Sequence, residues 1–353
     1  MTASKTFDKE KLQSLQKWNL ACFLVHLVTC VIFLVLFIVE WSSDNDGALK
    51  GIRTAVFVTV PVFDPDAVPT SLSNLSVEER QRLAETSGLK AVQKVPDSAL
   101  TLPLLIVAFS FITSMFHLWN YCDMKADKQL ETGNYGRMVL GEAGNQRRWL
   151  EYAITATVMV IIVALSFGLR ELYALLLIAS VVPAIMYMGH LVEKSMHRWA
   201  DSVRQKKPQA ASDGKTSSYP DKDAALFSTV LGWVLMSVVF GVLLASLTSA
   251  VETVDEFREK LDAQGDEETL SDFGDFKVLI ILSGVVILLF YSLFGVVQLI
   301  DLCKSAKSET FLVDEQKRGY NNEKLYCALS ASSKVILIVL LGWGLFGRSR
   351  NND

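Results

Sequence analysis

The stretch Leu325–Phe346, with the sequence LYCALSASSKVILIVLLGWGLF, decides the fold, because it is long and apolar enough to cross a membrane as a helix. Lys334 is its only charge and lies about ten residues, or roughly 15 Å of helix, from either end. An ammonium at that depth costs on the order of 3 kcal/mol to insert, and its side chain is too short to reach an interface. Such a lysine predicts either a buried ion partner or covalent chemistry on its neutral amine.

The composition is typical of a protein that crosses the lipid bilayer several times. The chain has 353 residues, of which 51% are hydrophobic and 20% charged, which suits apolar spans joined by polar loops. The net charge of −4 argues against nucleic acid as a partner. The five cysteines form no CxxC pair and the four histidines no HExxH motif, so we predict neither a disulfide framework nor a metal site. We do not expect an enzyme.

Seven apolar stretches are long enough to cross a hydrocarbon core of about 30 Å. We therefore expect an all-α membrane protein, a bundle of seven transmembrane helices. Only Arg170 and Glu171 separate the third stretch from the fourth, which indicates either a tight turn or one long buried helical hairpin. The stretches are Trp18–Trp41, Leu102–Tyr121, Trp149–Leu169, Leu172–Leu191, Ala224–Leu247, Val278–Leu302 and Leu325–Phe346.

The distribution of lysine and arginine predicts the orientation in the membrane. If the N-terminus is cytoplasmic, the cytoplasmic segments hold 21 of these residues and the extracellular segments hold 12. Positive charge collects on the cytoplasmic side of membrane proteins. We therefore expect residues 1–17 to form a cytoplasmic N-terminal segment, residues 18–347 the seven-helix domain, and residues 348–353 an extracellular tail.

Three connecting segments have a recognisable composition. The extracellular loop 42–98 contains an alternating run at Thr54–Phe63, which predicts a small β-ribbon, and then a helix-like segment that begins near Ser76. The acidic segment Ser249–Asp275 is most simply a solvated face. The cytoplasmic loop 201–222 has the composition of a linker, and we expect it to be flexible.

In a seven-helix bundle, a lysine in the last span suggests a Schiff base to retinal, formed when the neutral amine attacks the aldehyde. An anion must keep that linkage protonated, and Glu151 is the one carboxylate in the N-terminal part of the third span. For Glu151 to meet Lys334, the third helix must begin well before Trp149, around residues 142–145. Alternatively, Glu151 is an interfacial carboxylate paired with Arg148.

Two hydroxyl groups lie one helical turn from these charged residues. Ser330 precedes Lys334 by four residues and Thr155 follows Glu151 by four, so each hydroxyl shares a helix face with its charged neighbour. Each hydroxyl can orient the linkage or its counterion. The alternative is an ordinary hydrogen bond to the carbonyl oxygen of residue i−4.

Five aromatic residues in the fifth and sixth spans have the size to enclose a polyene. In a membrane helix, aromatic side chains also serve in ordinary packing, so both interpretations stand. The residues are Trp233, Phe240, Phe290, Tyr291 and Phe294.

Motifs in six of the seven spans resemble the heliorhodopsin family of retinal proteins, in the family's order. The two most specific are RWLEY at residues 148–152 and SASSK at residues 330–334. The others are His26, His117, the Gly189-x-x-x-Glu193-Lys194 pattern and Val297-Gln298.

The resemblance implies a rhodopsin-like bundle with retinal, all-trans in the dark, on Lys334 and with Glu151 as its counterion. It also implies a cytoplasmic N-terminus, in agreement with the charge distribution. His26, His117 and Arg148 would line a polar cavity that accepts protons; the alternative for each histidine is an ordinary hydrogen-bonded role in the core. The family's homodimer is the expected assembly, and Gly241-x-x-x-Ala245 is a candidate contact.

The residues expected of an ion pump are missing. Retinal-based pumps resemble one another in a second carboxylate four residues before the lysine and a proton donor eleven residues after the counterion; Ser330 and Ile162 stand there instead. We therefore expect a light-sensing photoreceptor with a slow photocycle and a signalling partner that the sequence does not identify. The alternatives are a light-gated or passive proton conductor that uses residues such as His26, His117, Glu193 or Glu40, and a non-retinal seven-helix receptor.

Overall fold

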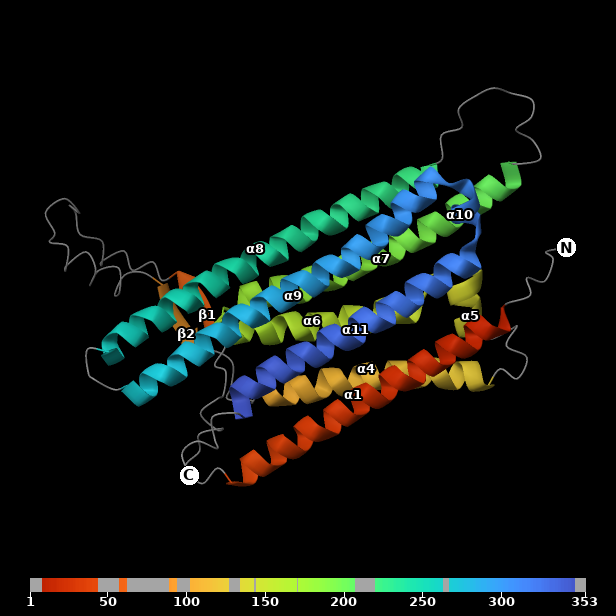
Figure 1. The fold of residues 1–353 in the computed structure, drawn as a ribbon. Coiled ribbons are helices and arrows are strands. Elements are labelled where there is room, and N and C mark those ends of the chain that lie inside the picture. Colours follow the sequence, from red (N-terminus) through yellow and green to blue (C-terminus); the bar gives the residue numbers. More distant parts are fainter. Residues whose placement is uncertain are drawn as a thin grey trace, which may run out of the picture.

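The computed structural model describes residues 8–43, 57–61, 89–93, 102–126, 134–142, 144–169, 171–206, 220–262 and 267–346. Long helices lie side by side in one bundle (Figure 1). They are α1 (Lys9–Ser43), α4 (Leu102–Ala126), α6 (Gln146–Ser166), α7 (Leu172–Lys206), α8 (Pro220–Asp262), α9 (Glu267–Lys307) and α11 (Glu315–Phe346). Shorter elements are α5 (Asn134–Gly136), the π-helix η2 (Arg137–Gly141) and α10 (Glu309–Val313).

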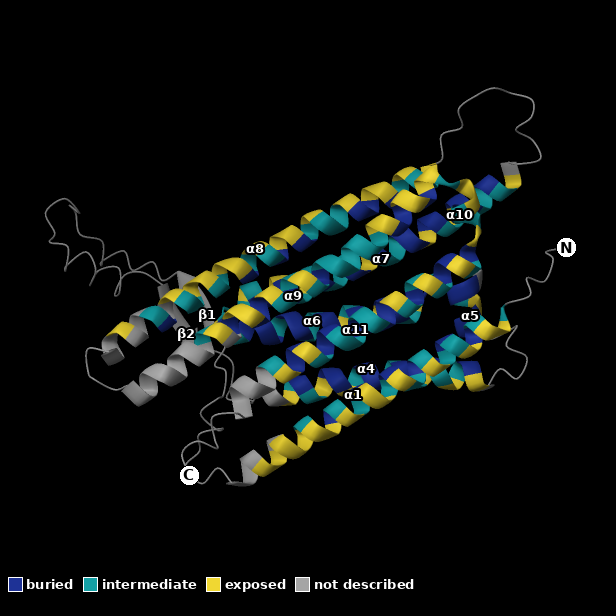
Figure 2. Cartoon of the chain, viewed as in Figure 1, coloured by how far each residue is buried: buried dark blue, intermediate teal, exposed yellow. Residues whose placement is uncertain are grey.

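Six helices in the described part of the chain are long and apolar enough to cross a membrane: α1, α4, α6, α7, α8 and α9. The chain is therefore an integral membrane protein that spans the bilayer several times. Helix α11, which contains the apolar stretch Leu325–Phe346 of the sequence, is not among the six. Helix α6 is the most buried of the six: 67% of its apolar stretch is buried inside the protein, against 17% of that of α8. Exposed residues follow the outer faces of α1 and α8 (Figure 2).

The helices continue beyond the apolar stretches of the sequence. Helix α8 has 43 residues, which is about 65 Å of helix and far more than the hydrocarbon core requires. Most of the predicted acidic segment Ser249–Asp275 is helical, in α8 and α9, where Lys277 Nζ lies 2.6 Å from Asp255 Oδ1. Hydropathy marks only the part of a helix that faces lipid, and it does not detect polar continuations rich in good helix formers.

The predicted connecting segments are only partly within the described residues. Strand β1 (Phe57–Pro61) lies inside the alternating run Thr54–Phe63 and pairs antiparallel with β2 (Leu89–Gln93). The helix-like segment near Ser76 and the tail 348–353 lie outside the described residues. Because α7 continues to Lys206 and α8 begins at Pro220, helices occupy both ends of the predicted flexible loop 201–222.

One end of the bundle, which we name the α10 end, carries α5, α10 and the first residues of α1 and α11 (Figure 1). Ion pairs fix the start of α11 there: Glu315 contacts His197 Nδ1 at 2.5 Å and Arg204 Nη2 at 2.6 Å, both on α7. Lys334 follows Glu315 by 19 residues, which places it about 28 Å along the helix. The lysine therefore lies near the middle of the bundle.

Helix α6 begins inside the bundle and not at its surface. Its N-cap is Asn145, which is 1% exposed and whose side chain accepts hydrogen bonds from the N–H groups of Arg147 and Arg148. This buried start satisfies the expectation that the third helix begins before Trp149, and it brings Glu151 to the depth of Lys334. After α6, Gly168 adopts φ +80, a left-handed conformation that favours glycine and closes the tight turn into α7.

Candidate functional site

Lys334 on α11 and Glu151 on α6 form a buried ion pair. Lys334 Nζ donates to Glu151 Oε1 at 2.7 Å and to Thr113 Oγ1 on α4 at 2.8 Å. Lys334 is 3% exposed and Glu151 2%. Each charge would be very costly to bury without the other. The alternative interpretation of Glu151, as an interfacial partner of Arg148, is therefore wrong.

The hydroxyl groups near this pair differ from the prediction. Thr155 Oγ1 donates to the carbonyl oxygen of Glu151 at 2.9 Å, which is the ordinary i−4 bond given as the alternative. Among the described residues, the buried Ser330 Oγ has no hydrogen-bond partner. The hydroxyl that contacts Lys334 belongs to Thr113, which the sequence does not distinguish from other threonines in apolar helices.

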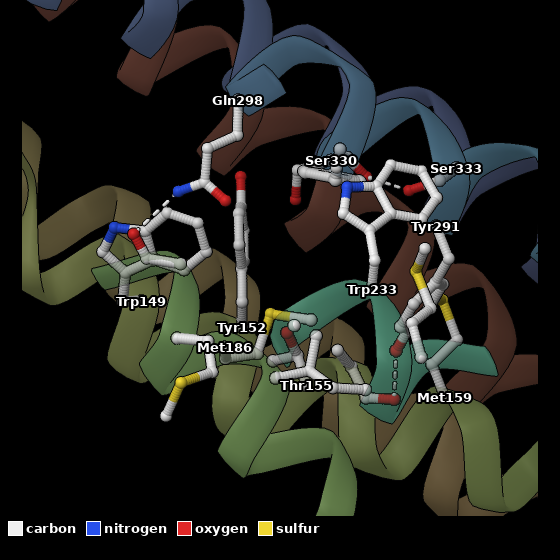
Figure 3. Close-up of a pocket in the computed structure, with 18 of the residues that line it drawn as sticks. Trp149, Tyr152, Thr155, Met159, Met186, Trp233, Tyr291, Gln298, Ser330 and Ser333 are labelled. Carbon is white, nitrogen blue, oxygen red and sulfur yellow. Dashed lines mark hydrogen bonds between the residues drawn. The ribbon is translucent and has the colours of Figure 1, made fainter. Parts of the chain in front are cut away.

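A cavity lies beside Lys334 between α6, α7, α8, α9 and α11. The space between its lining atoms is about 760 Å³, a volume that includes open solvent at its mouth. Trp149 and Tyr152 of α6 line one part of it, and Trp233 and Tyr291 line another (Figure 3). Four methionines also line it, and they are Met159, Met186, Met188 and Met236.

Three of the five predicted aromatic residues line the cavity, namely Trp233, Tyr291 and Phe294, and Tyr291 is held by a 2.8 Å hydrogen bond from its hydroxyl to Ala156 O. The other two do not line it. Phe290 precedes Tyr291 by one residue and so points about 100° away around the helix. Phe240 lies two turns beyond Trp233 and packs against the core.

The cavity contains residues that the sequence does not single out as a site. In the fourth span, Ile185, Met186 and Met188 line the cavity. Gln298 Nε2 donates to the carbonyl oxygen of Gly189 at 2.7 Å. A Cβ on Gly189 would collide with the ring of Trp149, so glycine is required for this wall. A methionine in an apolar helix gives no sign of whether it faces a cavity or the core.

A second group of charges is buried toward the α10 end. Arg148 donates to both Glu193 of α7 and Glu323 of α11. Trp149 Nε1 also donates to Glu193, at 2.7 Å, and Asn145 Nδ2 donates to Glu323, at 2.7 Å. We name Arg148, Glu193 and Glu323 the Arg148 cluster. Glu323 was missed because it lies in a polar segment that precedes the last apolar stretch.

The first four long helices, which include Glu151, carry the clearest relationship to known proteins. Residues 15–209, more than half of the chain, match the sequence model of the heliorhodopsin family. The chain belongs to the heliorhodopsin family. This heliorhodopsin is accordingly a retinal-binding, light-sensing rhodopsin, and a non-retinal receptor is excluded. The match ends before Lys334, and no curated protein matches the sequence.

The cavity of this heliorhodopsin fits retinal by its chemistry. Its wall carries an amine, Lys334 Nζ, which is the group that condenses with an aldehyde. The aromatic rings and methionines beside it suit an apolar polyene. Among the described residues, the lining contains no carboxylate. Glu151 lies behind the lining, and its carboxylate contacts the cavity wall through Lys334 Nζ.

One of the two predicted histidines, His117, lies on a buried hydrogen-bonded chain that leads to the Arg148 cluster. His117 Nδ1 lies 3.0 Å from Asn19 Oδ1, Asn19 Nδ2 donates to the Tyr135 hydroxyl at 3.0 Å, and that hydroxyl donates to Glu323 at 2.8 Å. Burial and the charge of Glu323 raise the pKa of Tyr135 well above its usual range, so the phenol remains a donor. The ring of His26 stacks on that of His117 at 6.0 Å.

Proposed function

We propose that this heliorhodopsin is a photoreceptor in which retinal, all-trans in the dark, is attached to Lys334 as a protonated Schiff base, with a slow photocycle and no efficient ion pumping. The observation that carries the proposal is the buried contact of 2.7 Å between Lys334 Nζ and Glu151 Oε1 at the wall of an apolar cavity. When bound, retinal supplies visible absorption and light-driven isomerisation.

The residues around Lys334 have separate tasks in this proposal. The neutral amine of Lys334 attacks the aldehyde, and one water molecule leaves as the linkage forms. Glu151 then keeps a proton on the Lys334 nitrogen, because a carboxylate in a site of low dielectric strongly favours a neighbouring cation. Thr113 is the second hydrogen-bonding partner of that nitrogen.

Reconstitution tests the proposed function. Protein expressed without retinal should be colourless and should develop a visible absorption band after all-trans retinal is added. Because free retinal in lipid absorbs at shorter wavelength, vesicles without protein serve as the control. No visible band from correctly folded protein would contradict the proposal.

We propose that α11 is the seventh span and that the α10 end is cytoplasmic. The support is the distribution of Lys and Arg, 21 against 12, together with the course of the chain: α1 begins at the α10 end and α11 ends at the opposite one. An epitope added at the C-terminus should bind antibody on intact cells, whereas an N-terminal epitope should require permeabilisation. The reverse pattern would overturn this orientation.

We expect illumination to drive no sustained proton transport. Pumping requires an acceptor on one side of the Lys334 nitrogen and a donor on the other. Ile162, in the position expected for a donor, is fully buried in the apolar core, and Ser330 replaces the second carboxylate. The measurement is the light-induced pH change of a cell suspension with and without a protonophore; a sustained, protonophore-sensitive change would contradict the prediction.

One observation favours a second function, a light-gated proton conductor. The polar chain from Arg148 to His117 provides buried proton-binding groups on the α10 side of Lys334. Photocurrents that reverse sign with the electrochemical gradient would support conduction. Their absence under voltage clamp supports the photoreceptor.

A further inference from the structure

Trp149 takes part in both of the buried sites described above. Its ring lines the cavity beside Lys334 (Figure 3), and its Nε1 donates to Glu193 Oε2 of the Arg148 cluster at 2.7 Å. Among the described residues that line the cavity, no other side chain donates a hydrogen bond to an acid of the cluster. Trp149 is therefore a direct connection between the cavity and the cluster.

The hydrogen bond from Trp149 to Glu193 is one of the stronger kinds. Glu193 is 6% exposed and Trp149 8%, so the bond is shielded from water, and an ionised acceptor strengthens it. The other oxygen of Glu193, Oε1, accepts from Arg148, which also donates to Glu323. A change at the indole N–H of Trp149 therefore acts on an acid that shares its arginine with a second acid.

The ring of Trp149 has no free space on the side of α7. A Cβ on Gly189 would collide with atoms of the six-membered ring, so ring and helix backbone are already in close contact. A displaced ring therefore turns or slides along α7, and Glu193 lies one helical turn beyond Gly189. Since the bond to Glu193 is 2.7 Å long, a displacement of about 0.5 Å carries it to the upper limit of ordinary hydrogen bonds.

We infer that Trp149 transmits the light-driven change at the cavity to the Arg148 cluster, by weakening the hydrogen bond from its Nε1–H to Glu193. The inference rests on the proposed function, because the ring is displaced only when a bound chromophore changes shape beside it. No proton leaves Trp149, since an indole is only a donor. Glu193 keeps Arg148 as a donor and loses the indole, so its hydrogen bonding changes even when no proton crosses the protein.

A second set of contacts joins the cavity to the cluster without a hydrogen bond. Phe294 lines the cavity, and its ring stacks on that of Tyr326 with centroids 5.8 Å apart. The guanidinium of Arg148 in turn lies 4.2 Å from the centroid of the Tyr326 ring. Such ring contacts tolerate a range of distances and depend less on direction than a hydrogen bond does. The test must therefore separate the indole N–H of Trp149 from the packing of rings.

The test uses light-minus-dark infrared spectra of full-length protein with retinal in lipid vesicles, with tryptophan labelled by ¹⁵N in the indole. Light should shift one labelled N–H band toward the frequency of a weaker hydrogen bond. A carboxyl band should change with it, and the absence of that band in Glu193→Gln assigns it to Glu193. Trp149→Phe keeps a ring beside Gly189 but has no N–H, so both signals should be lost while the visible absorption band remains.

The hydrogen bond itself is tested in protein without retinal. The labelled spectrum should contain one strongly hydrogen-bonded indole N–H band that is absent from Trp149→Phe. In Glu193→Gln this band should move toward weaker bonding, because a neutral amide is a weaker acceptor than a carboxylate. Trp119→Phe is the matched control, since Trp119 is 51% exposed on α4 and does not line the cavity. It should leave this band and both light-induced signals unchanged.

A folded, coloured Trp149→Phe protein that keeps the Glu193 signal would show that the change reaches the cluster by another contact, and the inference would be wrong. If Trp149→Phe fails to fold or to bind retinal, the labelled wild-type protein decides. Its light-induced spectrum must then contain an indole N–H band that shifts in Glu193→Gln, and the lack of such a band overturns the inference. Failure of the proposed function is distinct, because then the wild-type protein develops no visible band with retinal.

Discussion

Lys334→Ala should yield a protein that is produced and inserted but stays colourless when all-trans retinal is added. The substitution removes the amine at the cavity wall, so no covalent linkage can form. The visible spectrum after reconstitution measures the effect, which should be complete loss of the band. Lys317→Ala, which removes an exposed lysine of the same helix, should reconstitute like the wild-type protein.

The substitution also leaves Glu151 buried without its cation, which typically costs about 3–5 kcal/mol. If production of Lys334→Ala is poor for this reason, the double variant Lys334→Ala with Glu151→Gln removes both charges and should restore folding. It too must remain colourless. A visible band in either variant would end the assignment of Lys334.

Glu151→Gln should change the colour of the reconstituted protein and not abolish retinal binding. The substitution keeps the shape of the side chain but removes the anion beside the Lys334 nitrogen. Each 1.4 kcal/mol of stabilisation lost shifts the protonation equilibrium of that nitrogen about tenfold. The spectrum at neutral pH should therefore move to the red, if the proton is retained, or to the near ultraviolet, if it is lost.

A pH titration of the visible band distinguishes these two results, because only the second is reversed by acid. Glu252→Gln, an exposed carboxylate on α8, is the control and should titrate like the wild-type protein. If Glu151→Gln also behaves like the wild type, Glu151 is not the counterion.

The ion pair at the centre of the site could be predicted from the sequence because its two members are charges in apolar stretches. A charge buried in a membrane helix needs a partner, so the sequence pairs Lys334 with Glu151 although 183 residues separate them. The lining of the cavity could be predicted only in part, because aromatic residues in adjacent spans can face a cavity, the core or lipid. Tyr291 lines the cavity and its neighbour Phe290 does not, because the two side chains point to different sides of α9.

The polar residues near the helix ends could not be predicted. Glu323, Asp301 and Arg318 lie in segments where charges normally face water, and only the packing of α9 and α11 buries them. The contact of Thr113 with Lys334 could not be predicted either, because the hydroxyl of a threonine in a membrane helix usually donates to the backbone of its own helix. For such residues the sequence gives the chemistry, and only the fold gives the neighbours.

The buried start of α6 has an electrostatic consequence for the residues around it. The aligned peptide dipoles of a helix place about half a positive elementary charge at its N-terminus, here at Asn145 beside Glu323. With both acids ionised, Arg148, Glu193 and Glu323 sum to one negative charge, so the helix end brings the region to about −0.5. One added proton changes this to about +0.5, equally far from neutrality. The two protonation states of this region therefore differ little in the electrostatic cost of burying net charge.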